Sequence, residues 1–131
     1  MTDLVAALKA EHANIVKILG RVDELGAHTA EGHSALMTAK NGLLAHLGRE
    51  DEHLYPALRK AAVTDPVVAD ALEFFIEDIE AVSKLALAFF EKYADDASSE
   101  EFAGDFAALA GLLSARIQKE EGIIYKMYDQ L

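Results

Sequence analysis

The chain has 131 residues, 52% of them hydrophobic, with a formal net charge of −11 and no cysteine. This length suits one domain spanning residues 1–131. The acidic balance argues against nucleic acid or an anionic membrane as partner, because both are negatively charged. The lack of cysteine excludes disulfides, zinc–thiolate sites, iron–sulfur clusters and cysteine nucleophiles. The sequence shows no secretory signal pattern and no apolar run of about 18 residues. Together with the lack of cysteine, this leads us to expect a soluble, cytoplasmic protein.

The first half of the chain reads as two helices, because its apolar residues recur at steps of three and four. The first helix is expected from about Thr2, a residue type suited to an N-cap, to near Gly26. The second is expected from roughly Ser34 to Lys60, with Pro56 kinking its last turns.

The second half predicts two more helices. Asp65 followed by Pro66 is a strong start signal for the third, which is expected to run to about Tyr93. Ser98 and Glu101 form a capping-box pattern before the fourth. Because short connections make neighbouring helices antiparallel, the sequence predicts an all-α, antiparallel, up-down-up-down four-helix bundle.

Ionisable residues interrupt three of the four stripes expected to face the core. Buried ionisable groups are costly unless they are paired or bind a metal, so these interruptions indicate a polar site inside the bundle. The expected inward positions are Val5, Leu8, His12, Ile15, Leu19 and Val22 in the first helix; Leu36, Ala39, Leu43, His46, Glu50, His53 and Ala57 in the second; Val68, Leu72, Phe75, Ile79, Val82, Ala86, Phe89 and Tyr93 in the third; and Phe102, Phe106, Leu109, Leu113, Arg116, Glu120, Ile123 and Met127 in the fourth.

Four of these residues should lie at one level of the bundle. His12, Glu50 and Glu120 are each about ten residues from the same end, which is about 15 Å at the rise of an α-helix. His46 precedes Glu50 by one helical turn and faces the same way. Two imidazoles and two carboxylates suit iron, manganese or zinc. His12, His46, Glu50 and Glu120 are therefore our predicted metal ligands.

A weak internal repeat relates the two halves. Residues 43–51 align with residues 113–121 at a constant offset, which pairs Glu50 with Glu120 and, further on, Tyr55 with Tyr125. The same alignment places Arg116 opposite His46, so the second half lacks the histidines of the first.

The motifs that carry chemistry resemble those of the hemerythrin-like (HHE cation-binding) family. They are Glu-His-x-x-Ile at residues 11–15 and His-x-x-x-Glu at residues 46–50, followed by Leu-Tyr-Pro at residues 54–56. The resemblance implies a four-helix bundle around a non-haem di-iron centre that binds or senses oxygen, nitric oxide or iron, or stores metal.

Carried over by this resemblance, His12 and His46 match the histidines of one iron, and Glu50 and Glu120 match the two bridging carboxylates. One half of the centre is thus present. The positions for the histidines of the other iron hold other residue types, namely Phe75, Ile79 and Arg116.

Two functions remain open from these residues. In the first, the chain is a metal-binding or sensing module with one iron, manganese or zinc ion, and Arg116 balances the charge beside a site for a small diatomic ligand. In the second, no metal binds, Arg116 replaces its charge, and the chain is a structural or partner-binding bundle. An oxidase or peroxidase fits less well, because a single metal leaves little redox capacity. We therefore favour a protein that is not an enzyme, and the sequence does not identify a protein partner.

The remaining ionisable residues have plainer interpretations. His53 is expected on the inward face near the bundle end, hydrogen-bonded and partly wet, whereas His28 and His33 are expected in solvent. Glu121 is expected to be exposed, unless a register slip puts it in place of Glu120. Buried tyrosines with bonded hydroxyls are expected at Tyr55 and Tyr125, and a solvated acidic face at Glu73, Glu77 and Glu80.

Overall fold

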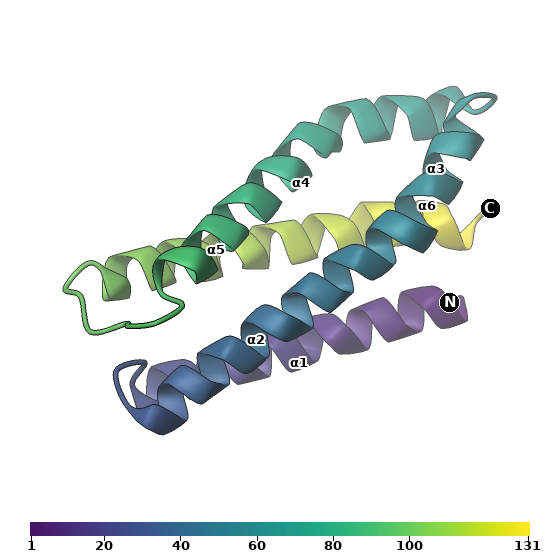
Figure 1. Ribbon diagram of the computed structural model, residues 1–131. Helices are drawn as coiled ribbons and strands as arrows, with labels where there is room; N and C mark the ends of the chain where they lie inside the picture. Colours follow the sequence, from purple (N-terminus) through teal and green to yellow (C-terminus); the bar gives the residue numbers. More distant parts are fainter.

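Four helical rods run antiparallel to one another in a computed structural model that describes residues 1–131, and the two termini lie at the same end (Figure 1). The all-α, up-down-up-down four-helix bundle is therefore confirmed. None of its helices combines the length and the apolar character that crossing a bilayer requires. The rods are α1 (Asp3–Leu25); α2 (Ala30–Arg49), the π-helical segment η1 (Glu50–Leu54) and α3 (Tyr55–Ala62); α4 (Pro66–Lys92); and α5 (Phe102–Lys119), the π-helical segment η2 (Glu120–Ile124) and α6 (Tyr125–Asp129).

The start signals of α1 and α4 act as predicted. The Thr2 hydroxyl accepts the backbone N–H of Val5 at 3.3 Å, and the Asp65 carboxylate accepts the N–H groups at the start of α4. These side chains satisfy backbone donors that have no partner inside the helix. The first rod ends at Gly26, whose φ of 81° lies in the left-handed region that glycine adopts readily.

Two other helix starts differ from expectation. α2 begins at Ala30 rather than near Ser34, because Thr29 caps it by accepting the N–H of Gly32 at 3.0 Å. The predicted capping box of the fourth rod is wrong. Asp96 accepts both the hydroxyl and the N–H of Ser98, at 2.8 and 2.9 Å, so this side chain is held in the loop instead of at the helix.

A π-helical turn interrupts the second and fourth rods at equivalent places. The N–H of Tyr55 bonds to the carbonyl of Glu50, and the N–H of Tyr125 bonds to the carbonyl of Glu120, each across five residues. Pro56 follows the first of these turns, but Lys126 stands at the same place after the second. The proline is therefore not required for this feature.

Each π turn adds one residue to the rod and advances the inward face by one position. His53, expected inward, is 61% exposed in its side chain, and Ile123 is 41% exposed. Both assignments were wrong because they assumed an uninterrupted α-helix. The residues buried instead are Leu54, Tyr55, Leu58, Ile124 and Tyr125.

Elsewhere the expected stripes hold, except that four further inward positions are half-buried rather than buried, namely Ala57, Phe102, Phe106 and Met127. All six inward positions of α1 are buried, and on α4 only Phe75 is half-buried rather than buried. The apolar core has two parts, one of 15 residues toward the α1–α2 turn and one of 10 toward the termini. The buried polar residues of the structure are His12, His46, Glu50, Arg116 and Glu120.

Candidate metal centre

The four predicted ligands meet in the interior. His12, His46, Glu50 and Glu120 are buried, and each offers one donor atom within 4.8 Å of the others. Around a tetrahedral ion with bonds of about 2.0–2.2 Å, donor atoms lie about 3.3–3.6 Å apart. The most distant donors would therefore move together by about 1 Å on binding an ion.

Carboxylates hold the outer nitrogen of both histidines. Nδ1 of His12 lies 2.9 Å from Oε2 of Glu121, and Nδ1 of His46 lies 2.9 Å from Oε1 of Glu11. Because a carboxylate accepts hydrogen bonds, each Nδ1 carries the proton and each Nε2 is the nitrogen left for a ligand bond. Carboxylates commonly orient metal-binding histidines in this way.

These orienting residues were missed or misread from the sequence. Glu121 does not replace Glu120, but pairs with His12. Glu11 is held in turn by Arg49, whose Nε lies 3.0 Å from Oε2 of Glu11. The one available signal was an acidic residue beside each inward position, on the half-buried edge of its helix.

The inner nitrogens of the two histidines lack adequate protein partners. Nε2 of His46 is buried without a hydrogen bond, although Oε1 of Glu50 is 3.3 Å away. Nε2 of His12 lies 3.2 Å from the hydroxyl of Tyr125, which also lies 2.9 Å from Oε2 of Glu50. A single hydroxyl proton serves only one of these two acceptors. Buried acceptors that outnumber donors fit a cation, so the donor set suits a metal ion.

The local environment changes the protonation of both rings. Burial lowers the pKa of His12, since it disfavours the charged ring. Burial acts the same way on His46, but the hydrogen bonds and charges of Glu50 and Glu11 outweigh it and raise the pKa of His46. A metal ion would compete with a proton for each Nε2.

Arg116 lies where the sequence placed it, beside both carboxylates. Its Nε donates to Oε1 of Glu120 at 2.7 Å, and its Nη2 lies 3.4 Å from Oε1 of Glu50. Its Nη1 donates to the carbonyl of Ile79 at 3.1 Å and to the Ser83 hydroxyl. The guanidinium, 6% exposed, thus fills the side of the site that faces α4.

The environment shifts the pKa values of the two carboxyl groups in opposite directions. Burial raises the pKa of Glu50, but hydrogen bonds with Glu120 and His46 and the charges of His46 and Arg116 lower it to about 2. Burial and the nearby Glu50 raise the pKa of Glu120 well above its ordinary value, against the opposing effect of Arg116. The two neighbouring carboxyl groups therefore differ in acidity, Glu50 being the stronger acid and Glu120 the weaker.

Two buried tyrosines cross between the halves. The Tyr125 hydroxyl donates to Oε2 of Glu50, and the Tyr55 hydroxyl lies 3.4 Å from Oε2 of Glu120. Burial and the charges of the glutamates raise the pKa of both phenols, so both remain donors. The expectation of buried tyrosines with bonded hydroxyls is confirmed.

The other singled-out residues lie away from this cluster. His53 is on the outside of η1, and His28 is exposed in the first turn, while His33 is half-buried on α2. The expected acidic surface of α4 is exposed at Glu73, Glu77 and Glu80.

Comparison with known proteins gives one match. The family model for the hemerythrin HHE cation binding domain matches residues 3–128, which includes every residue of the cluster. No curated protein and no solved structure matches the chain. Since the match covers nearly the whole length, the chain belongs to the hemerythrin HHE cation-binding family.

Proposed function

We propose that the chain binds a single non-haem metal ion through His12, His46, Glu50 and Glu120, and acts as a metal-binding or sensing module. The observation that carries this proposal is the pair of buried Nε2 atoms, one unpaired and one sharing a single proton with a carboxylate. Iron is the first choice, and manganese and zinc suit the same donors. A location in a reducing cytoplasm, suggested by the lack of cysteine, belongs to the same proposal.

Arg116 is the reason for proposing one ion rather than two. Its guanidinium lies against Ile79, one of the positions that the family resemblance matches to ligands of a second iron. The neighbouring position on α4 is Phe75, which has no donor atom. A fixed positive charge and apolar neighbours leave a second cation neither space nor ligands.

A bound ion of this kind would supply an open coordination position for a small diatomic ligand. The residues of the chain have separate tasks around it. Glu11 and Glu121 orient the two imidazoles. Tyr125 holds Glu50 by a hydrogen bond of 2.9 Å. Arg116 compensates negative charge that the ion alone would otherwise balance.

The second candidate is a metal-free structural or partner-binding bundle. It is favoured by the completeness of the arginine network, because Arg116 finds acceptors in Glu120, Glu50, Ile79 and Ser83 without any ion. In this case the polar layer would fix the register of the helices, a role that some buried polar groups have.

Metal counting on untagged protein separates the two candidates. Protein loaded with ferrous iron without oxygen, and in parallel with manganese or zinc, is expected to retain about one ion per chain, because the chain offers a single set of ligands. His46→Ala should lose it, whereas His53→Ala, which alters an exposed histidine of the same rod, should keep it. Two irons per chain would refute the single site, and no retained metal would favour the metal-free bundle.

A further inference from the structure

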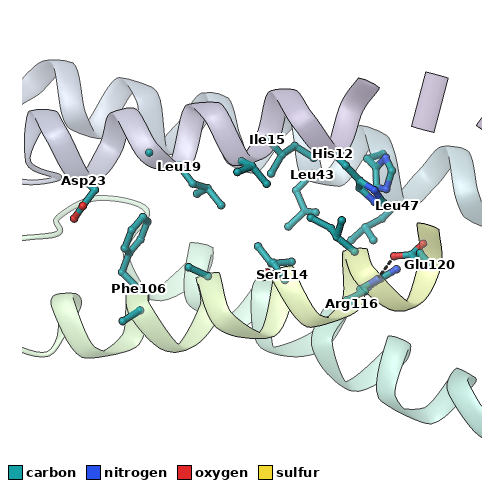
Figure 2. A pocket seen from close by; sticks show the side chains of 17 residues that line it. His12, Ile15, Leu19, Asp23, Leu43, Leu47, Phe106, Ser114, Arg116 and Glu120 are labelled. Carbon is teal, nitrogen blue, oxygen red and sulfur yellow. Dashed lines mark hydrogen bonds and ion pairs between the residues drawn. The ribbon is translucent and has the colours of Figure 1, made fainter. Parts of the chain in front are cut away.

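A long apolar cavity of about 390 Å³ leads away from the metal centre between α1, α2 and α5 (Figure 2). In Figure 2 Arg116 and Glu120 lie at one end of the cavity and Asp23 and Phe106 at the other. Its walls are aliphatic and aromatic along most of this length. They are formed mainly by Ile15, Leu19, Leu43, Leu47, Phe106 and Leu113.

The cavity is open because small residues face its mouth. Gly20 on α1 and Ala107, Ala110 and Ser114 on α5 line it, and all except the half-buried Ala110 are exposed. A Cβ atom added at Gly20 would meet no heavy atom within 4 Å. No side chain here is long enough to bridge the two helices, so the opening follows from the residue types that line it.

The volume indicates an organic ligand rather than a diatomic molecule. Ligand sites usually occupy about 300–1,000 Å³ and are mostly apolar with a few polar groups. By comparison with the cavity of about 150 Å³ that holds benzene, the present one accommodates roughly 10–15 non-hydrogen atoms.

Charge and hydrogen bonding restrict the chemistry of that ligand. The outer end carries the carboxylate of Asp23, and at the inner end the guanidinium of Arg116 is already ion-paired with Glu120 at 2.7 Å. No unpaired cation faces the cavity in a chain of net charge −11, so an anionic ligand is disfavoured. At the inner end His46 lines the cavity and has a buried nitrogen without a partner. A hydroxyl group both donates and accepts, and it can satisfy such a nitrogen in either protonation state.

We propose that this cavity binds a neutral, apolar alcohol or phenol, with its hydrocarbon part between α1 and α5 and its hydroxyl toward the metal centre. The inference deepens the proposed function and rests on it only in placing the hydroxyl beside the metal. The apolar walls hold the ligand with or without an ion.

Calorimetric titration with para-propylphenol tests this proposal on metal-free and metal-loaded protein. We expect binding to both forms. In the metal-free form, where Nε2 of His46 has no other partner, propylbenzene should bind several-fold more weakly than para-propylphenol because it lacks the hydroxyl. The anion para-propylbenzoate should bind at least about tenfold more weakly, because its charge would be buried beside Glu120 while the donors of Arg116 are already bonded within the protein. Absence of para-propylphenol binding to both forms, or equal binding of the benzoate, would overturn the proposal.

A matched pair of glycine substitutions locates the site. Gly20→Phe puts a ring at the mouth of the cavity, whereas Gly111→Phe places the same ring on an exposed part of α5 that does not line it. Both glycines lie inside helices with open space around them, so neither change should impair folding, which circular dichroism checks. Gly20→Phe should weaken para-propylphenol binding about tenfold or more by occupying its space, and Gly111→Phe should not. Equal affinity in the two variants would refute the assignment.

Failure of this proposal is distinguishable from failure of the proposed function. Protein that retains no metal but binds para-propylphenol would refute the metal site and support the cavity. Protein that retains one ion and does not bind para-propylphenol would support the metal site and refute the cavity proposal.

Discussion

Removal of the Arg116 side chain is the most direct test of the polar core. In Arg116→Ala the carboxyl groups of Glu120 and Glu50 lose donors at 2.7 and 3.4 Å, and both are almost completely buried. The carbonyl of Ile79 and the hydroxyl of Ser83 also lose a partner. Nothing else in the cluster carries a fixed positive charge.

The expected loss in the free energy of unfolding of the metal-free protein is about 3–5 kcal/mol, which is typical when one partner of a buried ion pair is removed. The Glu50–Glu120 pair of the variant can reduce this loss by binding up to one more proton than the same pair in the wild type. The folded variant then holds a proton that the unfolded chain releases, so the stability of the variant falls as the pH rises. The difference in unfolding free energy between wild type and variant should therefore grow by up to about 1.4 kcal/mol per pH unit.

Urea unfolding of wild type and variant between pH 6 and 8 measures this loss. Arg49→Ala is the control, because Arg49 is 47% exposed and its ion pair with Glu11 should contribute less than about 1 kcal/mol. With a metal bound, the loss in Arg116→Ala should be smaller, since the ion also compensates the carboxylates. A loss no larger than that of Arg49→Ala would show that Arg116 does not neutralise this site. An equal loss with and without metal would refute the shared role of ion and guanidinium.

Three further predictions concern the same cluster. The pKa of Glu50 is lowered from 4.5 to about 2, so Glu50 stabilises the metal-free fold above pH 4.5 and this contribution is lost as the pH falls toward 2. Urea unfolding across that range should show the free energy of unfolding falling with pH. Glu50→Gln should flatten this dependence, whereas Glu52→Gln, which alters an exposed residue, should preserve it. Tyr125→Phe leaves buried acceptors without a donor and should cost about 1–3 kcal/mol in thermal or urea unfolding, against a small effect of Tyr128→Phe; equal effects would contradict the role of that hydroxyl. Arg116→His restores one missing histidine and should raise metal affinity or content in loading experiments without reaching two ions per chain, and unchanged metal content would contradict the repeat argument.

Spacing alone predicted most of the bundle, because burial on one stripe dictates where apolar residues recur. The six inward positions of α1 and nearly all of those on α4 follow a regular α-helix, so a constant step located them. The clustering of His12, His46, Glu50 and Glu120 followed from the same regularity, since equal depths from one end put these residues at one level.

The residues beyond Glu50 and Glu120 could not be located in this way. A π turn changes the register by one residue, and neither rod has a local signal that reveals it, as the contrast between Pro56 and Lys126 shows. The burial of Tyr55 and Tyr125 directly after these turns shows what the extra residue achieves, because it brings a phenol inward next to a buried apolar residue. Such turns are frequent at functional sites.

The outer partners of the histidines were unpredictable for a different reason. Glu11 is adjacent to His12 in sequence but bonds to His46, and Glu121 is adjacent to Glu120 but bonds to His12. These pairs join different helices, so they depend on the rotation of each rod about its axis. A periodic pattern fixes which stripe faces inward, but it does not determine which residue at the edge of the stripe contacts a neighbouring helix.

The internal repeat explains why the centre is asymmetric. Each half supplies a π turn, a buried glutamate and a tyrosine that reaches the glutamate of the other half. The halves differ at one equivalent position, His46 in the first and Arg116 in the second. A guanidinium carries its positive charge permanently and directs its donors at fixed angles, whereas a histidine nitrogen can bind a cation. Arg116 is bonded in the second half, and the Nε2 of His46 is unpaired in the first. This difference is the basis of our proposal that the carboxylates share a built-in cation on one side with a single exchangeable one on the other.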